Sequence, residues 1–170
     1  VMDPQQRLLL EQGYTALHAE GRTKAGLMGS ETGVYVGVWA SEYTSVLATT
    51  PAGSSVFAAT AAACSVVVGR VSFVLGLHGP GASVDTACSS GLVACLSGMR
   101  ALQHDECPSA LVAGVNMIFS PAASFLAGVA GMTSLTGKSH SFDQRADGYA
   151  RGEACSAGVM QRGRVDPIAT

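Results

Sequence analysis

The stretch Ser83–Ala94, SVDTACSSGLVA, decides how this chain folds. It follows a Gly-Pro-Gly turn at Gly79–Gly81 and begins as a short strand, while from Ser89 onward apolar residues recur at helical spacing. Cys88 lies at the junction between that strand and that helix. It is either a small residue buried in the core, as free cysteines often are, or a nucleophile placed at the start of a helix.

The setting of Cys88 favours the nucleophile. The first N–H groups of a helix lack intrahelical partners, and the helix dipole favours negative charge there, so the site stabilises a thiolate. The neighbours Ala87, Ser89, Ser90 and Gly91 are small and leave room for a strained turn and a close substrate. The same N–H groups can receive the oxyanion of a thioester carbonyl. We therefore predict that Cys88 is the catalytic residue, an acyl-accepting nucleophile.

The other cysteines have no comparable setting, and we interpret them as packing residues: Cys64, Cys95, Cys107 and Cys155. No C-x-x-C pair occurs, so we predict no zinc site. We also expect no directly bound cofactor. An odd number of cysteines without an export signal indicates reduced thiols, and we expect a cytoplasmic protein.

The composition predicts one domain with a large core. Of 170 residues, 48% are hydrophobic and only 13% are charged, against roughly 25% in typical soluble domains. The segment 25–99 holds only four charged residues, and we expect it to be interior or interface: Glu31, Glu42, Arg70 and Asp85. The net charge is −2 without a basic run, so no nucleic-acid partner is predicted. The longest nearly apolar run, Val56–Val68, is too short to span a membrane.

The order of the expected elements is typical of a layered α/β fold whose sheet is buried on both faces. Helices are predicted over 4–21, 56–68, 89–103 and 121–130. Strands are predicted over 33–39, from Arg70 to the Gly-Pro-Gly turn, directly after that turn, over 110–119 and over 155–161.

The polar loop 141–153 has two interpretations. Its acidic residues, Asp143, Asp147 and Glu153, are of the kind that hold a cation. A solvated loop with salt bridges to Arg145 and Arg151 is the favoured interpretation.

Two other functional motifs are absent. The segment GMTSLTGKS has one residue too many between its glycines for a phosphate-binding loop, and the G-x-S-x-G motif of serine hydrolases does not occur.

The segment VDTACSS strongly resembles the active-site segment of β-ketoacyl synthases, above all the ketosynthase domains of modular polyketide synthases and related fatty acid synthases. The resemblance runs along nearly the whole chain in five ordered blocks with compatible spacing. These are MDPQQRLLLE (2–11), GVYVGVWASEY (33–43), AATAAACSVVVGRVSFVLGLHGPGASVDTACSSGLVA (58–94), ALVAGVNMIFSP (110–121) and GMTSLTGKSHSFDQRADGYARGEACS (131–156).

The resemblance implies a thiolase-like layered αβα fold, of which residues 1–170 would form a partial N-terminal half. It implies decarboxylative Claisen condensation: Cys88 takes an acyl chain from the phosphopantetheine of an acyl carrier protein, and a malonyl-type extender then loses carbon dioxide and attacks it. The implied partners are acyl carrier protein, acyl and malonyl thioesters, and a second copy in a homodimer whose strands pair at about 82–85.

The sequence departs from the family in its histidines. The family uses two, in H-G-T-G-T and N-I-G-H blocks, and this sequence contains neither block. Its four histidines fall where the family has no catalytic histidine: His18, His78, His104 and His140. There are three smaller departures. Ala61–Ala62 stand where many relatives have Gly-Thr, Gly91 replaces a common third serine, and Ala154–Cys155 stand where glycine then alanine is usual. Two functions therefore stay open, the acyl-binding half of a ketosynthase and a truncated or degenerate, non-catalytic relative.

Overall fold

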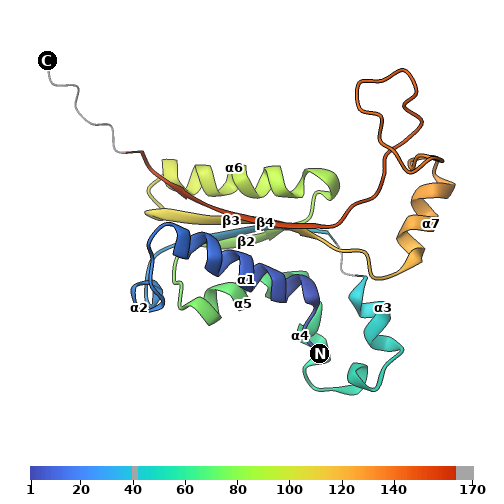
Figure 1. The fold of residues 1–170 in the computed structure, drawn as a ribbon. Coiled ribbons are helices and arrows are strands. Elements are labelled where there is room, and N and C mark those ends of the chain that lie inside the picture. Colours follow the sequence, from blue (N-terminus) through green and yellow to red (C-terminus); the bar gives the residue numbers. More distant parts are fainter. Residues whose placement is uncertain (40–41, 164–170) are drawn as a thin grey trace, which may run out of the picture.

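Four strands form one mixed sheet in the computed structural model, which describes residues 1–39 and 42–163 (Figure 1). The strand order is β2-β1-β3-β4. Three strands are parallel: β1 (Gly33–Val38), β2 (Gly81–Val84) and β3 (Ser109–Asn116). The last strand, β4 (Ala154–Gln161), runs antiparallel to β3.

Helices cover both faces of this sheet. Figure 1 shows α1 (Pro4–Ala19) and α5 (Cys64–Leu75) on one face and α6 (Ser90–Gln103) on the other. Successive residues of β1 point to opposite faces of the sheet. Val34 and Val36 pack in the core under α1 and α5, whereas Tyr35 packs in the core under α6. The predicted layered α/β fold with a sheet between helices is confirmed.

The shorter elements lie in the connections. They are α2 (Lys24–Leu27), α3 (Tyr43–Ala48), a 3₁₀ turn at Pro51–Ser54, α4 (Ala58–Ala61) and α7 (Pro121–Val129). The starts of the helices predicted over 4–21 and 121–130 are confirmed, and a side chain caps each of them. The Asp3 carboxylate accepts the N–H of Gln5 at 2.7 Å, and the Ser120 hydroxyl accepts the N–H of Ala122 at 3.1 Å. In the described part of the chain, no helix has the length and apolarity to cross a bilayer.

The segment before the Gly-Pro-Gly turn contradicts two predictions. The strand expected from Arg70 is wrong, because α5 continues to Leu75. The single helix expected over 56–68 is also wrong, since α4 and α5 are separate helices. The valines of α5 are β-branched, but Val67, Val71 and Leu75 fall four residues apart on one buried face, so burial at the helical period outweighs local strand propensity. Gly76, at φ 69°, ends the helix in the left-handed conformation.

Helix α6 turns mainly small residues toward the sheet, with Leu102 as the large exception. Ala94 is fully buried, and a Cβ atom at Gly98 would lie 2.8 Å from the Val112 side chain. On the outer side, Leu92 is 75% exposed and Leu96 is 41% exposed. The helical spacing of the apolar residues is confirmed, but the stripe that they form faces away from this sheet.

Candidate active site

Cys88 lies in a tight turn between β2 and α6, where a single 3₁₀ turn (Ala87–Ser89) leads directly into the helix. Its side chain is exposed, so the interpretation of Cys88 as a buried core residue is wrong. The preceding residue, Ala87, has φ 55°. A positive φ is uncommon in a residue with a side chain and marks local strain. The strained turn expected around this cysteine is therefore present.

One buried hydroxyl holds the strained turn in place. Ser90 is 5% exposed, and its Oγ accepts the N–H of Thr86 at 2.8 Å while donating to the carbonyl of Ala87 at 2.7 Å. A second side chain assists, because the Asp85 carboxylate accepts the N–H of Ala87 at 3.0 Å. These bonds fix the backbone on both sides of Cys88 and so limit where its thiol can lie.

Glycines let the first turn of α6 rest on the backbone of the sheet. A Cβ atom at Gly37 would lie 2.4 Å from the carbonyl carbon of Ser90 and 2.5 Å from the nitrogen of Gly91. At Gly114 a Cβ atom would lie 3.8 Å from the Cα of Gly91. The close contact at Gly37 needs a residue without a side chain, so the placement of Cys88 depends directly on this glycine.

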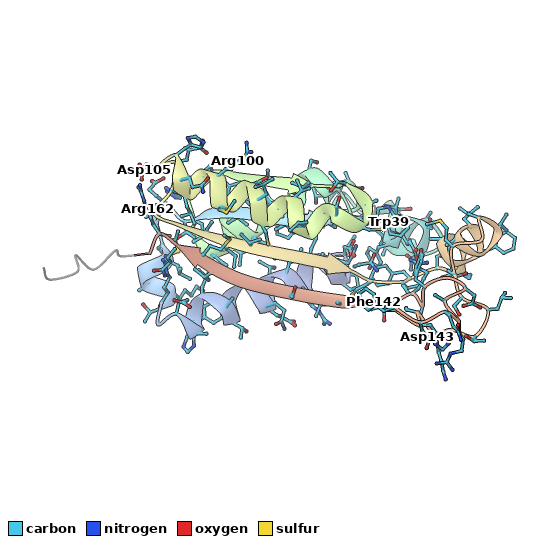
Figure 2. All side chains as sticks on the ribbon, turned by 90° about the horizontal axis from the view of Figure 1, so that it is seen from above. Trp39, Arg100, Asp105, Phe142, Asp143 and Arg162 are labelled. Atoms are coloured by element: carbon cyan, nitrogen blue, oxygen red, sulfur yellow. The ribbon has the colours of Figure 1, made fainter. Side chains whose placement is uncertain are left out.

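A cavity of about 490 Å³ opens beside Cys88. Its volume is that of a small-molecule site. Around the thiol it is lined by Ala87, Ser90 and Gly91, and from other parts of the chain by Trp39, Asn116, Met132 and residues 149–152. In Figure 2, Trp39 and Asp143 lie toward one end of the sheet, and the Asp105–Arg162 ion pair marks the opposite end. The carboxyl ends of the parallel strands thus face the cavity, where ligands of α/β sheets are usually bound.

The loop before β4 forms part of the wall of this cavity. Arg151 was predicted to pair with an acid of its own loop, and this is wrong: its Nη2 lies 3.5 Å from Oε1 of Glu42, far away in the sequence. Glu153 instead accepts the N–H of Ile118 at 2.7 Å. Sequence reasoning missed the role of Glu42. The signal was that Glu42 is one of the few charges in the apolar segment 25–99.

The acidic residues of the loop are held by protein donors. Arg145 and Asp143 form the predicted ion pair at 2.7 Å, and Arg145 lowers the pKa of that carboxyl. Asp147 accepts the N–H of Leu135 at 3.3 Å, and a hydrogen bond from the Ser134 hydroxyl lowers its pKa. No three potential metal ligands cluster anywhere in residues 1–39 and 42–163.

The other cysteines divide into two groups. Cys107 is buried, Cys64 and Cys155 are partly buried, and burial raises the pKa of all three thiols. Cys95 is exposed, so its interpretation as a packing residue is wrong. It lies on the outward apolar side of α6. The spacing of apolar residues predicted a helix here, but it did not show which face of that helix packs against the sheet.

No histidine of the described chain lines the cavity beside Cys88. All four lie in the described part of the chain. His18, His78 and His104 are exposed, and His140 is half-buried in the loop after α7. Within this cavity the thiol of Cys88 thus has no imidazole beside it.

Comparison with known proteins places this fold and turn in a family. The sequence model of the family described as "Beta-ketoacyl synthase, N-terminal domain" matches residues 1–165. The chain belongs to the β-ketoacyl synthase family. Over 159 residues it is 43% identical to highly reducing polyketide synthase 40 of Fusarium pseudograminearum, covering 94% of this chain and 6% of that protein. It is 41% identical over 161 residues to a phenolphthiocerol/phthiocerol polyketide synthase polypeptide of Mycobacterium tuberculosis, covering 95% of this chain and 10% of that protein.

Solved ketosynthases share the fold. The ketosynthase from module 6 of the bacillaene synthase of Bacillus subtilis 168 superposes with a TM-score of 0.82 at 34% identity, covering 95% of this chain and 27% of that one. An oxazolomycin ketosynthase domain of Streptomyces albus gives a TM-score of 0.84 at 30% identity, covering 95% and 28%. The thiolase-like α/β fold predicted from the resemblance is confirmed, and this β-ketoacyl synthase chain spans about a quarter of these solved chains.

Proposed function

We propose that this β-ketoacyl synthase chain is the acyl-accepting part of a ketosynthase, with Cys88 as the nucleophile. The observation that supports it is the exposed thiol of Cys88 at the start of α6, beside a cavity of about 490 Å³. The Cys88 thiolate attacks the carbonyl carbon of an acyl thioester. A bond forms from Sγ to that carbon, and the phosphopantetheine thiolate leaves and takes up a proton.

The donor in this proposal is an acyl carrier protein, and the reaction class is an acyltransferase of the 3-oxoacyl-synthase type. The apolar lining of the cavity near Cys88, including Val115 and Met132, suits the hydrocarbon of an acyl chain. The relatives are polyketide synthases, so the proposed product class is a polyketide. Free thiols such as Cys88 persist in the cytoplasm, which is the proposed setting.

Condensation belongs to the whole enzyme in this proposal, with residues 1–170 as its partial N-terminal domain. The malonyl-type extender loses carbon dioxide, and its carbanion attacks the acyl group on Cys88. The developing enolate and oxyanion need positioned donors, which the family supplies as two histidines. The alternative function, a non-catalytic relative, is favoured by one observation: no histidine of the described chain lines the cavity.

A labelling experiment separates these two functions. The full-length protein is incubated with an acyl-pantetheine donor, and the modified peptide is identified by mass mapping. The label is expected on Ser83–Ala94 and is expected to disappear in Cys88→Ala. Cys95→Ala is the matched control, because it removes another exposed cysteine of the same region and should leave the label unchanged. A label on Cys64 or Cys155, or acylation that persists in Cys88→Ala, would refute the proposal.

A further inference from the structure

Three segments that are distant in the sequence meet at one ion pair. Glu42 follows β1 at the start of α3, Arg151 precedes β4, and 119–124 form the start of α7. The side chains of Glu42 and Arg151 are only 13% and 11% exposed. At this burial the charges are screened less than those of a surface pair, and loss of one partner removes the opposite charge that faces the other.

Glu42 joins the ion pair to helix α7. Its Oε2 accepts the N–H of Phe119 at 2.9 Å and the N–H of Ser120 at 2.8 Å. These donors lie at the N-terminal end of α7, where helices leave N–H groups unpaired. The Glu42 carboxylate therefore satisfies the beginning of α7 with one oxygen and faces Arg151 with the other.

Arg151 is engaged on three sides. Its Nη2 faces Glu42, and its Nη1 donates to Ser124 Oγ in the first turn of α7 at 2.8 Å. The guanidinium carbon lies 5.7 Å from the centroid of the Trp39 ring, a cation–π distance. Trp39 and Arg151 both line the Cys88 cavity. A guanidinium with this many protein partners is suited to holding the wall rather than to binding an anionic substrate.

We propose that Glu42 and Arg151 are positioning residues that fix the cavity wall formed by Trp39 and residues 149–152, and thereby set the affinity for the acyl chain. This inference rests on the proposed function of Cys88. The wall is built from loop segments, which need such cross-links to keep one geometry. The turn that holds Cys88 has its own hydrogen bonds through Ser90, which do not involve the ion pair. Loss of the pair should therefore weaken acyl binding and spare the thiol.

The test compares Arg151→Gln with Arg145→Gln in the full-length protein. Arg145 is the matched control, because it lies on the same loop, has a side chain that is 70% exposed and pairs with Asp143. Acylation by N-acetylcysteamine thioesters of increasing chain length gives a half-saturating concentration and a maximal rate. Labelling of Cys88 by iodoacetamide, a reagent too small to need the wall, reports the thiol itself.

Arg151→Gln is expected to raise the half-saturating thioester concentration about tenfold, while the maximal rate and the iodoacetamide rate stay within about twofold. Arg145→Gln should change none of the three. Arg151→Lys keeps the charge facing Glu42 and is expected to recover part of the affinity. Ser124→Ala removes one hydrogen-bond partner of Arg151 and is expected to raise the half-saturating thioester concentration about threefold. This variant provides the same test if Arg151→Gln does not fold.

Two results would overturn this proposal. One is an unchanged half-saturating concentration in Arg151→Gln and Ser124→Ala. The other is a fall in the iodoacetamide rate as large as the loss of affinity, which would mean that the ion pair also holds the turn of Cys88 and does not act on the wall alone. An unsubstituted protein that takes up no acyl group would instead refute the proposed function of Cys88, and the two failures are thereby distinguished.

Discussion

Gly37 and Ser90 are in backbone contact, since a Cβ atom at Gly37 would lie 2.4 Å from the carbonyl carbon of Ser90. We predict that Gly37→Ala lowers the free energy of unfolding by about 3 kcal/mol, because α6 must move off β1 to admit a methyl group. The same shift should displace Cys88 and slow its acylation. Gly158→Ala is the control, because no atom lies within 4 Å of its added Cβ. Urea denaturation of the full-length variants measures the difference, and equal stabilities would contradict the prediction.

The thiols are predicted to react in two groups. Cys88 and Cys95 are exposed and should be alkylated first by iodoacetamide. Cys64, Cys107 and Cys155 should react more slowly, because they are covered and because burial raises their pKa, so less thiolate is present at neutral pH. Their rates should continue to rise at alkaline pH beyond the range of an ordinary thiol. Peptide mass mapping over time tests this order, which fast labelling of Cys107 at neutral pH would contradict.

The outward stripe of α6 is predicted to promote aggregation of the 170-residue chain. Leu92→Gln should slow the rise of light scattering and change the free energy of unfolding by less than about 0.5 kcal/mol, because Leu92 is 75% exposed. Ala94→Gln, on the fully buried side of the same helix, should destabilise the chain by about 3 kcal/mol. Equal effects of the two substitutions would show that the helix is not oriented as described.

The full-length protein is predicted to be a homodimer. In the sheet of residues 1–39 and 42–163, β2 is an edge strand, with β1 on one side and no strand on the other. Its residues carry no charge to protect that edge, so a second copy of β2 is the expected partner. Light scattering at micromolar concentration should give twice the mass of one chain. Monomer alone at that concentration would rule the dimer out.

The 170-residue chain is predicted not to catalyse condensation. No histidine of the described chain lines the cavity, and loss of one oxyanion donor already costs about 3 kcal/mol, roughly a hundredfold or more in rate. The chain is supplied with an acyl donor and a malonyl-loaded carrier protein. Neither carbon dioxide nor a β-ketoacyl product should exceed the background of Cys88→Ala. Product formation that depends on Cys88 would contradict the prediction.

The features that were predicted correctly from the sequence depend on residues close together in the chain. The small residues around Cys88 predict a tight turn into a helix, and the turn depends on contacts between near neighbours such as Ala87 and Ser90. The prediction failed at Arg70, where valines with strand propensity form a helix because a distant sheet buries one side of it. The pairing of Glu42 with Arg151 was missed for a related reason, since no local pattern links two loops that only the finished sheet brings together.

The double hydrogen bond of the Ser90 hydroxyl has a consequence for how this protein can evolve. One oxygen atom serves both the entry into α6 and the strained peptide next to Cys88. A substitution at Ser90 would therefore disturb the start of α6 and the turn next to Cys88 together, so selection that keeps the fold also keeps this turn. Variation in the shape of the cavity is therefore expected in its distant loops rather than at Ser90.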